Sequence, residues 1–482
     1  MRDARSNATL VALIVACAFF MENLDGSAVV VVLPQMAATF HTSASVASIG
    51  ITIYMVALAV LIPISGWGAD RMGARNLFCA AIAVFTIASV VCGYSSELWQ
   101  FAAARAVQGG AAAFMSPVGR IVVLKSAPKH ELMRAFGITI WQGLIAPILG
   151  QPIGGLIATY ATWEWIFFLN VPLGIAAIAA VLSFIDNRRE IDRRRLDVVG
   201  MVLAAASLSA LLYGLDRLSH EAPHLGLTAG LLAVGLFLGV WAVRHAHGHE
   251  YGLIDTRLAR IQSFSATSIW GGTFFRIAMG AVPFLLPLLF QISFGMTPFD
   301  VGILMLTYAG GNLIMKAMTN PILRRFGFRR VLLVNGVLVI LSTLSCALLV
   351  PGLSIIVIGI VLLVAGGVRS LQFTALNTLA FADIPSTGMS GASTLHAMVQ
   401  QIAFAFGIAL GAVILSVSSE LRNATAATMS VADFQIAFVG ATILTIVAMP
   451  WLVRLAEDAG DVVSGHSARR LARPDRTSGK AA

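Results

Sequence analysis

Two carboxylates stand within an otherwise apolar stretch near the start of the chain, FFMENLDGSAVVVVLP, which runs from Phe19 to Pro34. Glu22 and Asp25 are three residues apart, so on a helix they project from nearly the same face. A carboxylate near the centre of a bilayer costs about 3 kcal/mol, and such groups therefore face a polar partner or a wet cavity. Two acids this close also favour a state in which one of them holds a proton. The pair is thus a candidate proton carrier.

A structural role is the alternative for both acids. Asp25 would then be the partner of a neighbouring helix, and Glu22 would lie near the external surface. Five basic residues also lie within or at the margin of apolar runs: Arg105, Arg120, Arg276, Lys316 and Arg369.

The composition is that of an integral membrane protein. Of 482 residues, 58% are hydrophobic and only 11% are charged, and the mean hydropathy is +0.86, whereas soluble domains carry about 25% charged residues. The net charge of +9 does not indicate a nucleic-acid partner, because the basic residues lie in short loops between apolar runs. The four cysteines lie within apolar runs and form no C-x-x-C pair, so neither a disulfide framework nor a zinc site is expected.

Fourteen apolar segments are long enough to cross a bilayer as helices, which takes about 20 residues. They lie near residues 9–33, 46–66, 77–95, 98–122, 135–158, 164–185, 198–216, 224–243, 263–289, 298–322, 331–350, 353–381, 391–418 and 433–453. Twenty-five of the 32 Lys and Arg residues fall in segments on the same side of the membrane as the N-terminus, and only Arg217 and Arg422 fall in loops on the opposite side. Because basic residues accumulate in cytoplasmic loops, we expect a multi-pass protein of the cytoplasmic (inner) membrane with both termini in the cytoplasm.

A weak internal repeat divides the spans into two related halves. GWGADRMGARN (66–76) follows the second span and NPILRRFGFRR (320–330) follows the tenth, and their alignment pairs Gly73 with Gly327. The charged linker DNRREIDRRRLD follows the sixth span. We expect a six-helix bundle at residues 1–185, a cytoplasmic linker with two inserted helices at 186–262, a second six-helix bundle at 263–455 and a basic cytoplasmic tail at 456–482.

The sequence lacks the signature motifs of several function classes. The sequence has no G-x-x-x-x-G-K-[ST] loop, no H-E-x-x-H motif and no long soluble segment, so neither an enzyme nor a cofactor is expected. The cluster HAHGHE, with His245, His247 and His249, could bind a metal, but a solvated loop is the commoner interpretation and no metal site is expected. A secondary transporter, a channel and a membrane sensor remain.

Several motifs resemble those of the major facilitator superfamily. GWGADRMGARN is similar to the family's loop signature G-x-L-A-D-R-x-G-R-K, and ARAVQGGAAAF (104–114) is similar to its fourth-helix R-x-x-Q-G motif. GLIAPILGQPIGG (143–155) resembles the fifth-helix motif of the antiporters. The opening stretch and WEWIFFLNVPLG (163–174) resemble motifs of the 14-helix drug:proton antiporter branch. The resemblance implies an all-α integral membrane protein with the major facilitator fold, in which two six-helix bundles and two inserted helices give 14 transmembrane helices.

The resemblance assigns roles to three groups of residues. Asp25, Glu22 and Arg105 would couple proton binding to substrate binding. A gating loop would comprise Gly66, Asp70, Arg71, Gly73 and Arg75. The fifth-helix motif would supply close packing and bending through Gly143, Pro147, Gly150, Gly154 and Gly155. The alternatives are a structural anchor for Arg105 and a merely basic cytoplasmic loop for the second group.

Other polar and aromatic residues in the expected helices could line a central cavity. They are Gln108, Trp141, Gln142, Trp270, Arg276, Arg369, Gln372, Asn377, His396 and Gln400. His396 and Gln400 share a helix face because they are four apart, and an interhelical hydrogen bond is the alternative role for them. Phe373 could stack on a flat substrate, although aromatic residues more often face lipid or the core.

We expect a proton-coupled secondary transporter that moves a small organic compound across the cytoplasmic membrane by alternating access, with export in exchange for protons as the leading hypothesis. The alternative is proton-coupled uptake of a small aromatic metabolite or vitamin such as riboflavin. A non-transporting sensor or channel is a third hypothesis. The expected partners are the substrate, protons and the lipid bilayer, without nucleic acid, and the protein is expected to function as a monomer.

Overall fold

Helices make up all the regular structure of the described residues. The computed structural model describes residues 2–62, 64–126, 132–185, 197–217, 225–248, 260–384, 389–422 and 429–460. The first half of the protein contains α1 (Arg2–Thr39), α2 (Ala44–Ala47), α3 (Ile49–Leu61), α4 (Ile64–Met72), α5 (Ala74–Gly93), α6 (Leu98–Ser126), α7 (Leu132–Tyr160), α8 (Trp165–Phe168) and α9 (Asn170–Phe184). Two further helices, α10 (Val198–Arg217) and α11 (Leu225–Gly248), follow. The second half contains α12 (Gln262–Phe264), the π-helix η2 (Ser265–Ile269), α13 (Gly271–Leu288), the π-helix η3 (Leu289–Ser293), α14 (Pro298–Phe326), α15 (Phe328–Ala347), α16 (Ile355–Ala380), α17 (Met389–Leu421) and α18 (Val431–Val453).

Each of the fourteen expected membrane spans coincides with a helical segment, and the prediction of an all-α membrane protein is confirmed. Thirteen helical segments among the described residues are long and apolar enough to cross a membrane, and the fifth expected span corresponds to α7, which has 29 residues. Three spans predicted as single helices are divided: α2, α3 and α4 form the second, α8 and α9 form the sixth, and α12, η2 and α13 form the ninth. Pro172 lies in the first turn of α9, where its missing N–H is tolerated, and this position favours a new helix start.

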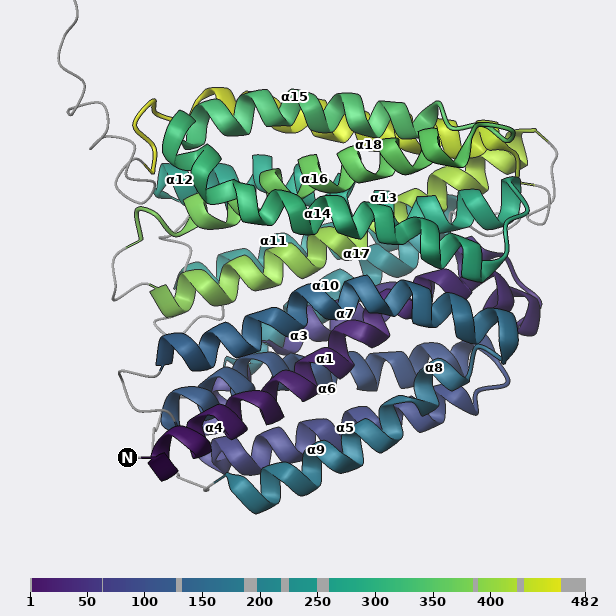
Figure 1. Cartoon of the computed structure of the whole chain (residues 1–482). Coiled ribbons are helices and arrows are strands. Elements are labelled where there is room, and N and C mark those ends of the chain that lie inside the picture. The colour runs from purple at the N-terminus through teal and green to yellow at the C-terminus, as the bar shows by residue number, and fades with distance from the viewer. Residues whose placement is uncertain are drawn as a thin grey trace, which may run out of the picture.

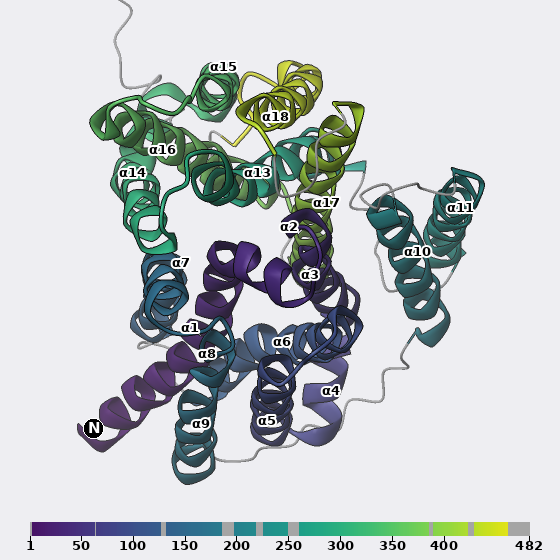
Figure 2. The same cartoon turned by 90° about the vertical axis from the view of Figure 1, so that its right-hand side faces the viewer.

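The two halves form neighbouring bundles, and the two inserted helices lie beside them. In Figure 1 the first half lies below the second, and in the end-on view of Figure 2 α10 and α11 stand to one side, next to α3 and α17. Val56 and Val60 of α3 form one apolar cluster with Leu208 of α10 and with Ala405 and Ala409 of α17. The inserted pair is therefore attached where the two halves adjoin.

The arginines at the helix ends mark one end of the bundle. Arg71 lies in the last turn of α4, Arg329 lies in the first turn of α15, and Arg454 directly follows α18. The end of α4, the start of α15 and the end of α18 lie at the left-hand end in Figure 1, here termed the basic end. At that end Gly73 and Gly327 each join two helices with a positive φ, 86° and 75°, which glycine adopts without the strain of a Cβ atom. The paired glycines of the sequence repeat therefore make the same kind of turn in both halves.

The two halves are in close contact at the end opposite the basic end. A Cβ atom on Gly155 of α7 would stand 2.3 Å from the carbonyl oxygen of Pro298 on α14. Beside this contact, the Phe299 N–H donates a hydrogen bond of 3.0 Å to Thr159 Oγ1. At the basic end, α4 packs mainly against α5 and α6 of its own half. The described contacts thus close the end of the molecule that lies opposite the basic end.

Candidate functional site

Asp25 lies at the centre of a buried polar network in the first half. Its exposed fraction is 1%. Arg105 Nη1 donates to Asp25 Oδ2 at 2.6 Å, while Gln108 Nε2 and Asn170 Nδ2 donate to Asp25 Oδ1 at 3.2 and 3.1 Å. Both carboxylate oxygens are therefore engaged, and a guanidinium balances the negative charge, as a buried carboxylate requires. The network joins α1 to α6 and α9.

Arg105 extends this network to a third region of the half. The side chain is fully buried, its Nε donates to the Gly50 carbonyl of α3 at 3.3 Å, and its guanidinium lies 4.2 Å above the ring of Tyr54. α6 approaches α3 closely because Gly109 has no side chain: a Cβ atom there would stand 2.1 Å from the Tyr54 carbonyl oxygen. Arg105 therefore contacts both α1, through Asp25, and α3, through Gly50 and Tyr54.

Two members of the network, Ser89 and Asn170, are absent from the sequence predictions. Gln108 Nε2 donates to Ser89 Oγ at 2.8 Å, and Asn170 Nδ2 donates to the same oxygen at 3.2 Å. Asn170 could have been recognised from the sequence, since it is an amide within the apolar stretch WEWIFFLNVPLG. Ser89 could not, because its hydroxyl also donates to the Phe85 carbonyl of its own helix, and helical serines commonly make this bond.

Glu22 has a partner of its own. Its half-buried side chain accepts a hydrogen bond of 3.0 Å from Ser116 Oγ on α6. Among the described residues, no hydrogen bond joins Glu22 to Asp25. The described contacts of the two acids of α1 therefore differ: Asp25 accepts from a charged group and two amides, whereas Glu22 accepts from a neutral hydroxyl.

The residues of the expected gating loop lie at the basic end of the first half. Gly66, Asp70 and Arg71 belong to α4, Gly73 forms the turn and Arg75 lies in the first turn of α5; the side chains of Gly66 and Asp70 lie outside the described set. Arg75 Nη2 donates to the Leu182 carbonyl of α9 at 3.1 Å. The exposed Arg71 lies 5.5 Å from the ring of Trp67. Arg75 thus attaches the loop to another helix of the same half.

The fifth-helix motif lies along α7 and brings that helix against two others. Its members are Gly143, Pro147, Gly150, Gly154 and Gly155, of which the side chains of Gly143 and Pro147 are outside the described set. A Cβ atom on Gly150 would stand 1.9 Å from Ser27 Oγ, and one on Gly154 would stand 2.9 Å from the Ala28 carbonyl oxygen. Gly150 and Gly154 therefore allow α7 to pack on α1, and Gly155 allows it to pack on α14.

Arg276 in the second half is a buried cation. It is 0% exposed, and among the described residues no carboxylate pairs with it. Its Nη1 donates to the Thr267 carbonyl at 2.9 Å, and its Nη2 donates to Asn377 Oδ1 at 2.9 Å. The irregular turn at η2 directs the Thr267 carbonyl to Arg276, and Gly272 leaves room for it, since a Cβ atom there would stand 1.6 Å from that oxygen.

His396 completes this second cluster. Its Nδ1 lies 2.8 Å from Ser268 Oγ, its Nε2 lies 3.1 Å from Asn377 Oδ1, and its ring centroid lies 5.0 Å from that of Phe381. The structure therefore brings together Arg276, Asn377 and His396, which come from α13, α16 and α17. Gln400, half-buried, follows His396 by one turn of α17.

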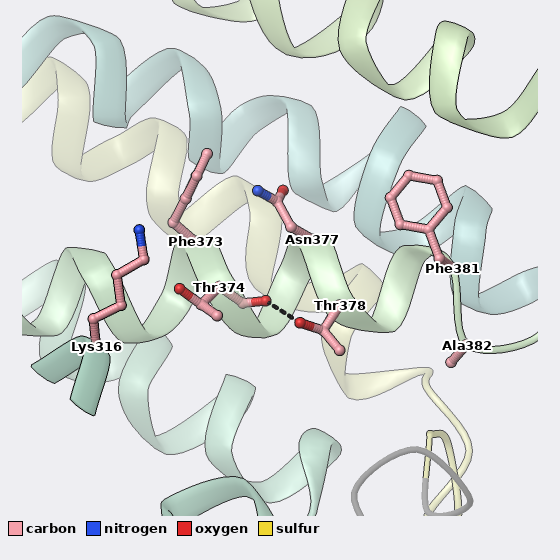
Figure 3. Close-up of a pocket in the computed structure, with 7 residues that line it drawn as sticks. All are labelled: Lys316, Phe373, Thr374, Asn377, Thr378, Phe381 and Ala382. Carbon is pink, nitrogen blue, oxygen red and sulfur yellow. Dashed lines mark hydrogen bonds between the residues drawn. The ribbon is translucent and has the colours of Figure 1, made fainter. Parts of the chain in front are cut away.

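A pocket of about 500 Å³ opens beside this cluster, at the end of α16 nearest the basic end (Figure 3). It is lined by Lys316, Phe373, Thr374, Asn377, Thr378, Phe381 and Ala382. All except Lys316, which belongs to α14, lie on α16 or directly after it. Of the residues expected to line a cavity, Asn377 is the one found in this lining, beside the aromatic candidate Phe373.

The other expected lining residues are spread over the structure. Gln372 is buried between α15 and α16, where its Oε1 accepts from Asn335 Nδ2 at 2.9 Å. Arg369 is half-buried on α16. Trp270 is 52% exposed and stacks on Trp451, with ring centroids 6.4 Å apart. The side chains of Trp141 and Gln142 lie outside the described set.

Known proteins match this chain in sequence and in fold. The family profile described as Major Facilitator Superfamily matches residues 15–408 and 269–474. A protein of Pectobacterium carotovorum subsp. carotovorum, named "Putative multidrug resistance protein MdtD", is 35% identical over 443 residues, which cover 91% of this chain and 94% of that protein. A protein of the same name from Escherichia coli O6:H1 is 36% identical over 405 residues, which cover 83% and 85%.

Solved structures share the fold at much lower identity. The crystal structure of an auto-inhibited POT family peptide transporter covers 94% of this chain and 97% of its own, with a TM-score of 0.66 and 14% identity. An inward-facing, occupied structure of a bacterial homologue of the human lysosomal transporter Spinster covers 92% and 95%, with a TM-score of 0.64 and 13% identity. The family match spans most of the chain and the helices have the corresponding arrangement; the protein belongs to the Major Facilitator Superfamily and is a multi-pass membrane transporter.

Proposed function

We propose that this transporter exports small organic compounds from the cytoplasm in exchange for protons, through alternating access to a site between its two halves. The observation that carries the proposal is the pair of acids on α1, Asp25 and Glu22, which have different partners on α6. The relatives named for multidrug resistance support export over the alternative of uptake.

Asp25 and Arg105 would couple protonation to helix packing. Protonation of Asp25 removes the negative charge that Arg105 faces at 2.6 Å, and the guanidinium then keeps its contacts with Gly50 and Tyr54 on α3. The attachment of α1 to α6 weakens while that of α6 to α3 persists. Glu22, which accepts a hydrogen bond from the neutral Ser116 hydroxyl, would exchange a proton more readily and relay it toward Asp25.

The direction of opening follows from the basic end. If the positive-inside rule applies, the basic end lies in the cytoplasm, together with both termini, and the closed end faces the outside of the inner membrane. Gln291 of η3 supports this closure from the second half, because its Nε2 donates to the Val31 carbonyl of α1 at 2.8 Å. The arrangement would then be the one that receives substrate from the cytoplasm.

Two rigid bodies would move in the cycle. We assign them to residues 1–185 and 263–455, with 186–262 as the linker and inserted pair and 456–482 as a cytoplasmic tail. The gating-loop residues would hold the basic end closed in the other state of the cycle. One chain contains both halves and the cavity wall, so the monomer is the proposed functional unit.

Transport in everted membrane vesicles tests the proposal. Vesicles from cells that overproduce the protein are energised with an acidic interior, and uptake of a panel of labelled aromatic cations and anions is measured. We expect accumulation that collapses with a protonophore and that Asp25→Asn abolishes. Glu97→Gln, which removes an exposed acid before α6, is the matched control and should retain transport. Concentrative uptake of the same compounds by intact cells would instead establish import.

A further inference from the structure

The charges of the two halves are distributed unequally. The first half places Asp25 and Glu22 on α1 and pairs its buried Arg105 with Asp25. In the second half Arg276, Lys316 and Arg369 lie within helices that cross the membrane, and none of them forms an ion pair with a carboxylate in the part of the chain that the structure describes. The sequence of α13, GGTFFRIAMGAVPFLLPL, contains no Asp or Glu.

An R-x-x-Q element occurs in both halves, and it allows the partners of corresponding arginines to be compared. Arg105 and Gln108 lie on α6, and Arg369 and Gln372 lie at the corresponding place on α16. Each glutamine is anchored to the preceding span, Gln108 by Ser89 on α5 and Gln372 by Asn335 on α15. The arginines differ, because α1 supplies Asp25 to Arg105 whereas α13 has no acid to offer Arg369.

Lys316 and Arg369 lie on two helices that pack backbone to backbone. A Cβ atom on Gly311 of α14 would stand 1.9 Å from the Leu363 carbonyl of α16, and Ser370 Oγ donates to Asn312 Oδ1 at 2.8 Å. Lys316 lines the pocket, and Arg369 precedes the pocket residue Phe373 by one turn of the same helix. Positive charge is thus concentrated along this wall.

Asn377 presents hydrogen-bond donors to the same pocket. Its Oδ1 is engaged by Arg276 Nη2 at 2.9 Å and lies 3.1 Å from His396 Nε2. Because a guanidinium only donates, the atom that faces Arg276 must be the oxygen, and the amide nitrogen is left for the pocket. In Figure 3 this nitrogen lies on the side of Phe373 and Lys316.

We infer that this pocket binds the carboxylate of an aromatic organic anion. Lys316 is its charge partner, Asn377 is its hydrogen-bond donor, and Phe373 and Phe381 contact the ring. A carboxylate only accepts hydrogen bonds, which matches a lining rich in donors. The pocket volume of about 500 Å³ lies in the range of small-molecule sites. Arg276 acts as a positioning residue, since it orients Asn377 from behind.

Binding of three probes with one ring system tests the inference. The probes are 2-naphthoate, 2-naphthylmethanol and 2-naphthylmethylammonium, and calorimetry with the purified full-length protein in detergent at neutral pH measures their affinities. We expect 2-naphthoate to bind at least about tenfold more tightly than the alcohol, since hydrogen bonds to charged groups contribute that much. Lys316→Gln should remove most of this preference, and Lys316→Arg, which keeps the charge, should retain it.

Two further variants separate local from general effects. Arg369→Gln should weaken 2-naphthoate binding in the same direction as Lys316→Gln. Arg217→Gln removes one charge from α10, outside the two halves, and should leave the affinity unchanged. Tighter binding of the ammonium probe, equal affinities for 2-naphthoate in wild type and Lys316→Gln, or no measurable 2-naphthoate binding would each overturn the inference.

The inference rests on the proposed export function, because it treats the pocket as part of the transport route. The binding test itself uses no proton gradient. Loss of gradient-driven transport with intact 2-naphthoate selectivity would therefore contradict the exchange mechanism alone. Transport driven by protons without selectivity for 2-naphthoate would contradict the anion site alone.

Discussion

At the scale of single residues, Asp25 and Glu22 show that two acids on one helix face can have different environments and different roles. Asp25 accepts hydrogen bonds from Arg105, Gln108 and Asn170 and is almost fully buried. Glu22 is only half-buried and accepts a hydrogen bond from a neutral hydroxyl. We therefore expect Asp25 to contribute more than Glu22 to the stability of the first half.

This difference predicts unequal effects on stability. Asp25→Asn keeps the size of the side chain but leaves Arg105 buried without its counter-charge, and removal of one partner of a buried ion pair costs about 3–5 kcal/mol. We expect a clearly lower unfolding temperature for the purified variant, followed by tryptophan fluorescence in detergent. Glu22→Gln is the matched control and should unfold near the wild-type temperature. Equal unfolding temperatures for Asp25→Asn and wild type would show that the ion pair does not stabilise the fold.

The sequence predicts part of this network and misses the rest for a physical reason. Asp25, Arg105 and Gln108 belong to motifs whose residue types are unusual in apolar helices, so they can be recognised from the sequence. Ser89 is an ordinary helical serine, and its role depends on which face of α5 meets α6. The position of Asn170 beside Asp25 likewise depends on the division between α8 and α9, which hydropathy alone does not indicate.

At the scale of elements, the π-helix η2 is the feature that sets the geometry of the second half. Its irregular turn ends at Trp270, whose backbone lies at φ −97° and ψ −88°, and it directs the Thr267 carbonyl to Arg276. The apolar pattern of residues 263–289 is the same for a regular helix, so the sequence predicts the span without the turn.

Gly272→Ala should disrupt this turn. The added Cβ atom would stand 1.6 Å from the Thr267 carbonyl oxygen, so η2 or α13 must shift, and overpacking of this kind costs about 1–3 kcal/mol. We expect a lower unfolding temperature and weaker 2-naphthoate binding, because Arg276 would orient Asn377 less well. Gly230→Ala on α11, where nothing lies within 4 Å of the new atom, is the control. Unchanged stability and binding in Gly272→Ala would contradict the role assigned to η2.

At the scale of the whole molecule, the two halves meet through backbone contacts between α7 and α14. Gly155 faces Pro298, and Gly302 faces Gln151, where a Cβ atom would stand 2.8 Å from the carbonyl oxygen. The division into two bundles and two inserted helices follows from the sequence, because the repeat and the alternation of basic loops are both visible in it. Which end of the bundles is closed does not follow, since one sequence must support both states of a transport cycle.

Gly155→Ala should shift the population toward the state that is open at this end. The new Cβ atom would stand 2.3 Å from the Pro298 carbonyl oxygen and would push α7 away from α14. In a variant without the four native cysteines, a cysteine at Val301, which is 0% exposed, reports the opening through labelling by an impermeant maleimide. We expect faster labelling with Gly155→Ala and no change with Gly310→Ala, which meets nothing within 4 Å. Equal labelling rates for both would rule out the glycine contact as the closure.

The contacts at Gly155 and Gly302 have a consequence for ion leakage. Where helix backbones touch directly, there are no long side chains whose rotamers must change when cargoes of different size occupy the space further in. The tightness of the closed end is therefore set by the chain itself and not by the compound being carried. A transporter built in this way keeps this end closed to ions whatever the size of the compound that it carries.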